Sequence, residues 1–359
     1  RENARKGMEA LLRLQTITGT DGFVARTFIP SDWEQMHDAN REWTPRQRAD
    51  RQVSDPRYKP VEERWRPTPD GRWLWKGDTS SDEITGHFYF FHHYYDLVAT
   101  EEEKEALRAH VAKVMDYIIE GGYVLRDIDG ASTRWGVWAP ERLNEDPDWQ
   151  AERGVNSAEI CSFLLVAHHI TGDEKYHDEY ERLLFEEGYL ENIRTAKNYG
   201  ASQNTHIDDI LLTLTFPALF KYEDDPDILA VYRESLERWY AGIANEQNPW
   251  SNFTYGMITG QPPALDDSLF FLRDAPLDRV NWRWDQRLRE DLRIVREPIL
   301  EQPSTHRLLP PSERAVVRWD KNPWMHVAGD GGRTEWAPTF WLLPYWQGRY
   351  AGYIAAPEE

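Results

Sequence analysis

Four side chains able to carry acid–base chemistry lie close together in the sequence: Asp78, Asp82, Glu83 and His87. They follow an aromatic loop, Trp-Leu-Trp-Lys-Gly, and they lie where a helix over 81–98 is expected to begin. Ser80 is a favourable N-cap residue, and Glu83 three residues later completes a capping box, which gives Glu83 a structural role. The helical spacing mixes polar groups and rings on the same faces, whereas a surface helix separates them. Such a helix is typical of the wall of a cavity.

A second group of such side chains comes at another expected helix start: His206, Asp208 and Asp209. The pattern Thr205-x-x-Asp208 again resembles a capping box, which leaves His206 and Asp209 as the freer groups. Glycoside hydrolysis uses two carboxyl groups about 5–5.5 Å apart for retention and about 6.5–9.5 Å apart for inversion. We therefore expect a catalytic pair drawn from Asp82, Glu83, Asp208 and Asp209.

Elimination from a uronic acid is the alternative chemistry, and it needs other groups. A base must remove the proton next to the carboxylate, and a cation must neutralise that carboxylate. The residue types that fit the base are His87, His206 and Tyr255, and those that fit the cation are Arg126 and Arg349. Both chemistries remain open at the level of the sequence.

Aromatic residues are unusually frequent, with 17 tryptophans and 17 tyrosines, many of them in expected loops. Aromatic faces stack on the C–H faces of sugar rings, and their polar edges bind hydroxyl groups. We therefore expect a carbohydrate cleft, with tryptophans that pin loops to the core as the structural alternative. The side chains expected to bind the substrate are Asp78, Arg126, Arg134, Trp135, Trp138, Trp250, Tyr255 and Arg349.

The sequence gives little support to a metal or a cofactor. The adjacent pairs His92-His93 and His168-His169 would point about 100° apart on a helix, so neither pair converges on one ion. Cys161 is the only cysteine and lies in an apolar run, which excludes a disulfide framework and a thiolate metal site. Without a glycine-rich phosphate loop or a Gly-x-Ser-x-Gly elbow, we expect no nucleotide and no serine-hydrolase chemistry.

The net charge of the chain restricts the classes of molecule that it is expected to bind. Lys+Arg 42 against Asp+Glu 62 gives a net charge of −20 over 359 residues, whereas nucleic acids and anionic membranes attract basic surfaces. No run of about 18 apolar residues predicts a membrane span. Because the chain starts at Arg1 inside an expected helix, we expect an exported protein whose signal was removed, with a cytoplasmic location as the alternative.

Apolar periodicity predicts helices that follow one another in pairs, at about 2–18, 81–98, 101–120, 156–171, 173–187, 205–221, 226–244 and 336–354. Shorter helical stretches are expected near 264–272 and 285–297, in a looser region that begins after Pro249-Trp250, and a β-hairpin over 123–138 that turns at Asp129-Gly130. Short and long links alternate, as in a closed ring of helical hairpins. We therefore expect one all-α domain over 1–359, with a long loop-rich segment at 19–80. A superhelical repeat array is the alternative, but no fixed period supports it.

Three stretches together resemble a known group: Gly77-Asp-Thr-Ser-Ser-Asp-Glu-Ile-Thr-Gly-His87, Asp127-Ile-Asp-Gly-Ala-Ser-Thr-Arg-Trp-Gly-Val-Trp138 and Leu342-Leu-Pro-Tyr-Trp-Gln-Gly-Arg-Tyr350. They resemble a little-characterised bacterial family that is similar to six-hairpin glycosidases and is linked to polysaccharide use. The resemblance implies an (α/α)6 barrel that acts on saccharides. This chain departs from the family pattern at His206-Ile207, where a serine and an aspartate are expected.

These observations together predict a glycoside hydrolase with a carbohydrate substrate. The enzymatic alternative is a polysaccharide lyase or an oligosaccharide dehydratase that acts on uronic-acid-containing glycans. The third hypothesis is a glycan-binding barrel without catalytic activity.

Overall fold

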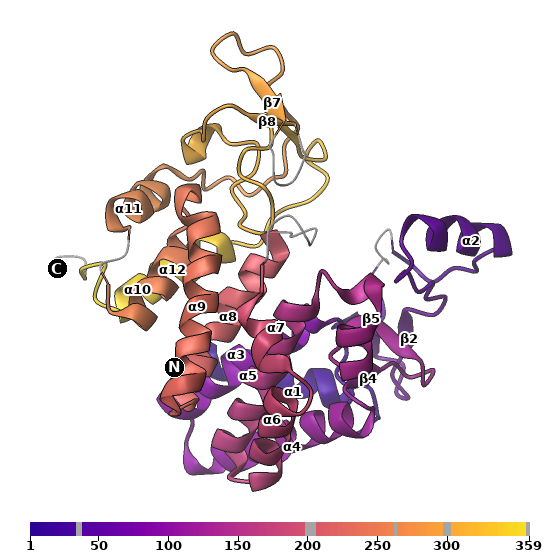
Figure 1. Ribbon diagram of the computed structural model, residues 1–359. Helices are drawn as coiled ribbons and strands as arrows, with labels where there is room; N and C mark the ends of the chain where they lie inside the picture. Colours follow the sequence, from indigo (N-terminus) through magenta and orange to yellow (C-terminus); the bar gives the residue numbers. More distant parts are fainter. Residues whose placement is uncertain (34–37, 198–205, 262–263, 297–302, 357–359) are drawn as a thin grey trace. The chain divides into compact units, whose positions relative to one another are not determined.

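The computed structural model describes residues 1–33, 38–197, 206–261, 264–296 and 303–356 (Figure 1). The chain is mostly helical, which confirms the all-α class. It divides into two compact units. The first unit comprises Arg1–Ile193 and Lys221–Ile228, and the second comprises Arg194–Phe220 and Leu229–Glu359.

Helix α5 lies at the centre of the first unit, packed against α3, α4 and α6 (Figure 1). Most of its side chains are buried, including Cys161. The helices of this unit are α1 (Glu2–Thr16), α2 (Pro45–Ser54), α3 (Ser81–Leu97), α4 (Glu101–Glu120), α5 (Arg153–Thr171), α6 (Glu174–Phe185) and, across the unit boundary, α7 (Tyr189–Arg194). Short links join α3 to α4 and α5 to α6, so the expected helical hairpins are confirmed here. Closure into six hairpins stays a prediction.

Local sequence signals explain where these helices begin and end. Thr100 accepts a hydrogen bond from the backbone N–H of Glu103, and the Glu103 carboxylate accepts one from the N–H of Thr100, which caps α4. Glu83 caps α3 in the same way, by accepting from the N–H of Ser80 at 2.8 Å. Gly172 ends α5 with φ 71°, a left-handed conformation that glycine adopts without strain.

Short antiparallel strands occupy the segment that the sequence predicted as loop-rich. Strand β3 (Trp73–Lys76) pairs with both β1 (Thr27–Pro30) and β2 (Trp65–Pro67). The prediction for 19–80 was therefore incomplete, because these strands are too short to show a clear alternation. The expected β-hairpin is confirmed as β4 (Val124–Arg126) and β5 (Ser132–Val137).

The second unit has its own core, in which Phe253, Phe271 and Phe340 pack together. Its helices are α10 (Pro249–Thr259), α11 (Leu265–Asp274), α12 (Thr339–Tyr350) and, across the unit boundary, α8 (His206–Tyr222) and α9 (Pro226–Ile243). Helix α10 corrects the expectation of a looser region after Pro249, because Asn248 caps a regular helix there. The short strands of this unit are β6 (Trp284–Asp285), β7 (Ile294–Arg296), β8 (Pro303–Thr305) and β9 (Val327–Ala328).

The helix expected over 285–297 is wrong, since β6 pairs with β9 and β7 pairs with β8 at its two ends. Pairing with residues distant in sequence decides the structure of this segment. None of the helices in the described ranges is both long enough and apolar enough to cross a membrane.

Candidate functional site

The backbone at the opening of α3 is held in a strained shape. Asp78 has φ 55°, a left-handed conformation that is uncommon for a residue with a side chain. Its N–H donates to Oδ2 of the buried Asp127 at 3.0 Å. A Cβ on the preceding Gly77 would stand 2.9 Å from Arg66 Nη1 and 3.0 Å from Asp127 Oδ1, so a larger residue here would displace these side chains. Strained residues of this kind cluster at functional sites.

The carboxyl group of Asp78 lies at the edge of the interior, with 6% of the residue exposed. Its Oδ2 is 3.9 Å from Arg64 Nη2, and its Oδ1 accepts from the N–H of Arg134 at 3.5 Å. Burial raises the pKa of Asp78 above its ordinary value, and the nearby arginine charges only partly oppose this shift. Asp78 therefore favours its protonated form more than an exposed aspartate does.

Asp82 and Glu83 lie in the first turn of α3 but are held differently. The Asp82 carboxylate is partly exposed, and its Oδ2 accepts from the Ser80 hydroxyl at 2.9 Å. Both oxygens of Glu83 are occupied, Oε2 by the N–H of Ser80 and Oε1 by Arg26 Nε at 3.0 Å. The positive end of the helix stabilises the charge of both groups. Glu83 thus acts as a capping residue, and Asp82 is the carboxylate that a ligand could contact.

Glu159 on α5 is a member of this site that the sequence did not indicate. Its side chain is fully buried, and it accepts from Thr85 Oγ1 at 2.9 Å and from Trp138 Nε1 at 2.8 Å. Burial raises the pKa of Glu159 to about 8, and the negative charge of Asp82 adds to the effect. Glu159 is therefore protonated at neutral pH. The available signal was an ionisable residue within the apolar run 155–170.

Two residues that were expected to contact substrate or take part in catalysis lie in the core. His87 is 7% exposed, packs edge to face on Phe91, and has a pKa lowered to about 3 by burial and by the nearby His110. It is neutral at physiological pH and belongs to the packing of α3. Trp138 is fully buried and uses its N–H on Glu159, so its ring is not available to stack on a sugar.

The other first-unit candidates lie on the β-hairpin. Trp135 is partly buried, and the guanidinium groups of Arg57 and Arg134 each lie 4.6 Å from a centroid of its ring. Arg134 also pairs with Asp55. Arg126 donates to two backbone carbonyl groups, at Gly121 and Gly130, and so holds the hairpin in shape. Trp135 and Arg134 are neighbours on β5, and the backbone N–H of Arg134 is the donor to Asp78. Arg126 has a structural role.

The second predicted cluster belongs to the second unit. His206 Nε2 lies 2.8 Å from Glu246 Oε1, and Lys197 Nζ lies 3.3 Å from Asp209 Oδ1 and 3.9 Å from Asp208 Oδ2. Burial alone would lower the pKa of His206, but the Glu246 carboxylate raises it overall. Burial raises the pKa of Asp209 to about 6 against the opposing charge of Lys197. These groups form a buried charge network. The expected cap Thr205 lies outside the described residues.

Three further candidates lie elsewhere in the second unit. The Tyr255 hydroxyl donates to Glu237 at 2.8 Å, and burial raises the pKa of Tyr255 to about 12. Trp250 is 4% exposed and packs edge to face on Trp319 at 4.6 Å. Arg349 lies in the last turn of α12.

The structure therefore brings Asp78 and Asp82 to one helix opening and places Glu159 behind them, and it gathers His206, Asp208 and Asp209 separately. A catalytic pair that joins Asp82 to Asp208 or Asp209 would combine the two units and stays a prediction. In the described parts of the chain, no group of three or more His, Cys, Asp or Glu side chains is arranged to hold a metal ion. Comparison of the chain with models of protein families, with curated proteins and with solved structures found no match.

Proposed function

We propose that this protein is a glycoside hydrolase whose acid and base are Asp78 and Asp82. The observation that carries the proposal is the unequal environment of these two carboxyl groups at one helix opening. Burial raises the pKa of Asp78 and favours its protonated form, whereas Asp82 is partly exposed at the positive end of α3. Two carboxyl groups in unlike environments, one buried and one partly exposed, are the parts that glycoside hydrolysis needs.

In this proposal Asp78 donates its proton to the glycosidic oxygen as the bond between that oxygen and the anomeric carbon breaks. Asp82 acts on the other side, either by taking a proton from the attacking water or by attacking the anomeric carbon itself. Water supplies the hydroxyl of the new reducing end. Glu159 is a positioning residue, because it is fully buried and cannot touch the sugar. Its neutral form adds no negative charge behind Asp82.

The finer fold that we propose is an (α/α)6 barrel. The hairpins α3–α4 and α5–α6 support it, because their short links lie at the opposite end of the helices from the long link over 121–152. The start of α3 lies beside the first half of α5, as the hydrogen bond between Thr85 and Glu159 requires. This places the carboxyl groups at the end that carries the long links, where barrel enzymes of this kind would bind substrate.

His206 and Tyr255 are the residues of the second unit that could act as the base of an elimination, and both are poorly suited to that role. His206 holds its proton to higher pH because of Glu246. Tyr255, with a pKa of about 12, is almost entirely protonated at neutral pH. A base must be free of its proton before the reaction starts. Together with the burial of His87, the third candidate base, in the core, these observations favour hydrolysis over elimination.

The test compares Asp78→Asn and Asp82→Asn on a panel of plant and algal glycans, followed by reducing ends and by ultraviolet absorbance of unsaturated uronates. Each variant is expected to lose activity by about 100-fold or more. Substrates with a leaving group that needs no proton should restore Asp78→Asn but not Asp82→Asn. Asp178→Asn, an exposed aspartate on α6, is the matched control and should retain full activity.

Other outcomes identify the alternatives. Ultraviolet absorbance in step with chain cleavage would show elimination and would overturn the assignment of Asp78 and Asp82 as a hydrolytic pair. Glycan binding without reducing ends or absorbance would show a glycan-binding barrel. Full activity of both Asn variants would place the catalytic groups elsewhere in the chain.

A further inference from the structure

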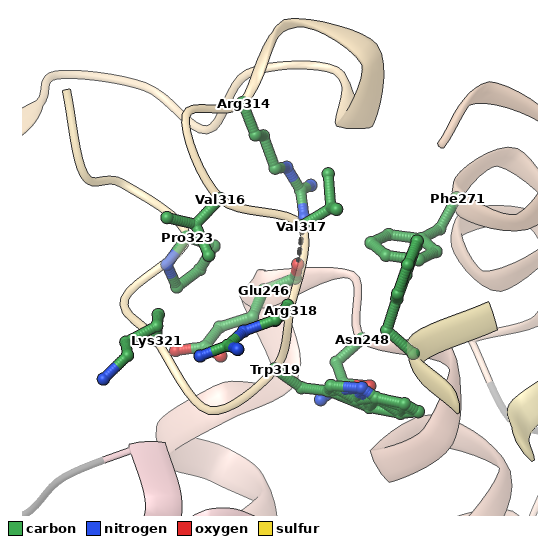
Figure 2. A pocket seen from close by; sticks show the side chains of 11 residues that line it. Glu246, Asn248, Phe271, Arg314, Val316, Val317, Arg318, Trp319, Lys321 and Pro323 are labelled. Atoms are coloured by element: carbon green, nitrogen blue, oxygen red, sulfur yellow. Dashed lines mark hydrogen bonds between the residues drawn. The ribbon is translucent and has the colours of Figure 1, made fainter. Parts of the chain in front are cut away.

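Figure 2 shows the hollow beside Arg314 in the second unit. Its free space of about 20 Å³ has room for a single water molecule. The guanidinium group of Arg314 donates to the carbonyl oxygens of Leu309 and Glu246 and to the side-chain oxygen of Gln247, so all three of its nitrogen atoms have acceptors. The hollow therefore belongs to the internal packing of this unit and is too small for a sugar ring.

In the first unit, Asp78 is held at both of the peptide groups that flank its Cα. Its N–H donates to Asp127 Oδ2 at 3.0 Å, and its carbonyl oxygen accepts from Arg26 Nη1 at 3.3 Å. Asp127 directly follows β4 and Arg26 directly precedes β1, so both partners reach Asp78 from other parts of the chain. Because a residue has only two soft backbone rotations, these two bonds fix the direction of the Asp78 carboxyl group.

The conformation that these bonds hold is an unfavourable one for Asp78. At φ 55° the backbone is left-handed, and the Cβ of an L-residue then comes close to the following carbonyl oxygen. Relaxation to a negative φ would turn the carboxyl group away from Arg64 and from the N–H of Arg134. The protonated form of Asp78 depends on this buried position, because burial raises its pKa.

Asp127 uses its two carboxyl oxygens differently. Oδ1 accepts from the N–H of Ile128 at 2.7 Å within the hairpin turn, whereas Oδ2 reaches across to Asp78. Only 2% of Asp127 is exposed, so water competes little for these oxygens and the bond to Asp78 is stronger than it would be at the surface. A carboxylate is also a stronger acceptor for an N–H group than a neutral oxygen is.

We propose that Asp127 is a positioning residue that keeps the carboxyl group of Asp78 in place for catalysis. It acts through the backbone of Asp78 and, being buried, does not touch the substrate. That Asp78 is the acid rests on the proposed function, whereas the hold of Asp127 on Asp78 rests on the hydrogen bond itself.

Two substitutions at Asp127 separate the hydrogen bond from the charge. Asp127→Asn removes the charge but keeps an oxygen that can accept from Asp78, whereas Asp127→Ala removes both. On the glycan identified by the panel, Asp127→Ala should lower kcat by about 100-fold, as expected when a catalytic group is displaced, and should leave KM nearly unchanged. Asp127→Asn should retain most of the wild-type kcat.

Asp129→Ala is the matched control. Asp129 lies in the same turn and accepts from the N–H of Ala131 at 2.9 Å, a bond that stays within the turn. Asp129→Ala should keep the wild-type kcat, and an equal loss in Asp127→Ala and Asp129→Ala would mean that the stability of the hairpin controls activity. An equal loss in Asp127→Ala and Asp127→Asn would mean that the charge matters and the hydrogen bond does not. Either result overturns the inference.

Amide hydrogen exchange at Asp78, followed by NMR, tests the hold without any substrate. The N–H of Asp78 should exchange faster by about tenfold or more in Asp127→Ala, since it loses its acceptor, and at the wild-type rate in Asp129→Ala. Unchanged exchange in Asp127→Ala overturns the inference even if Asp78→Asn is inactive. Faster exchange together with full activity of Asp78→Asn would confirm the hold on Asp78 and refute the hydrolytic proposal instead.

Discussion

Glu159 is an ionisable group within a helix whose buried side chains are mostly apolar. Its two hydrogen bonds, from Thr85 and Trp138, satisfy the carboxyl oxygens but do not supply a counter-charge. The charged form is therefore penalised, and the pKa rises from its ordinary value of 4.5 to about 8 in the folded protein. Proton binding by this one residue is thus coupled to folding.

The first prediction concerns the pH dependence of stability. Between about pH 4.5 and pH 8 the unfolded chain releases the Glu159 proton while the folded chain keeps it. The stabilisation from this proton is complete below the unfolded pKa and is lost as pH rises, by up to about 1.4 kcal/mol per pH unit. Glu159→Gln keeps the shape and cannot titrate, so its free energy of unfolding should fall less steeply over this range.

Chemical denaturation of the wild type and of Glu159→Gln across this pH range measures the difference. Glu102→Gln changes an exposed carboxyl group on α4 and should reproduce the wild-type slope. Equal slopes for the wild type and Glu159→Gln would show that burial does not hold this proton.

Single residues were predictable only where neighbours in the sequence define their role. The capping role of Glu83 follows from Ser80 three residues earlier, and the structure confirms it. The role of Glu159 depends on Thr85 and Trp138, which reach it from other elements. Trp138 was assigned to substrate because tryptophan frequency does not show which ring is buried.

At the scale of elements, the caps of α3 and α4 provide a matched pair. Both are capping boxes, with Ser80 and Thr100 as the N-cap residues. They differ in the use of the hydroxyl group. Ser80 Oγ lies 2.9 Å from Oδ2 of Asp82, the proposed catalytic carboxylate, and 2.7 Å from Glu83 Oε2, whereas Thr100 Oγ1 accepts from the N–H of Glu103. The same substitution at the two caps therefore distinguishes an effect on the free energy of unfolding from an effect on catalysis.

The second prediction is that Ser80→Ala and Thr100→Ala each lower the free energy of unfolding by about 1 kcal/mol, the typical value of an N-cap. Only Ser80→Ala should also lower kcat on the glycan identified by the panel, because Asp82 then loses a hydrogen bond. Denaturation and steady-state kinetics measure the two effects. A similar change of kcat in both variants would mean that helix stability alone controls activity.

Helices were predicted more reliably than strands for a physical reason. Helix α4 was expected at 101–120 and spans Glu101–Glu120, since its cap and its apolar period are both local signals. Strands β1, β2 and β3 depend on pairing between residues far apart in sequence, such as Thr27 with Lys76. Helix α10 was missed because glycine and polar residues interrupt its apolar pattern.

At the scale of the whole molecule, the chain has two units with separate cores. In the first, Phe163 on α5 stacks on Phe88 at 4.7 Å and packs edge to face on Trp138 at 5.6 Å. In the second, Phe253 on α10 is fully buried within its own cluster. The sequence predicted one domain because the apolar periodicity of helices continues through both units.

The third prediction is that core substitutions act within one unit. Phe163→Ala should raise amide hydrogen exchange in α3 to α6, and Phe253→Ala should raise it in α10 to α12. Each substitution removes a fully buried ring, at a cost of roughly 3–5 kcal/mol. Hydrogen-exchange mass spectrometry resolves the two regions, and a uniform increase across both units in either variant would show a single cooperative core.

Cys161 carries the single thiol of the chain, and its reactivity reports on local opening of α5. Cys161 is fully buried in α5, and burial raises the pKa of its thiol, which leaves almost no reactive thiolate in the folded protein. A labelling reagent can modify this sulfur only after α5 separates from the helices around it. The labelling rate therefore measures how often α5 opens, without any engineered probe.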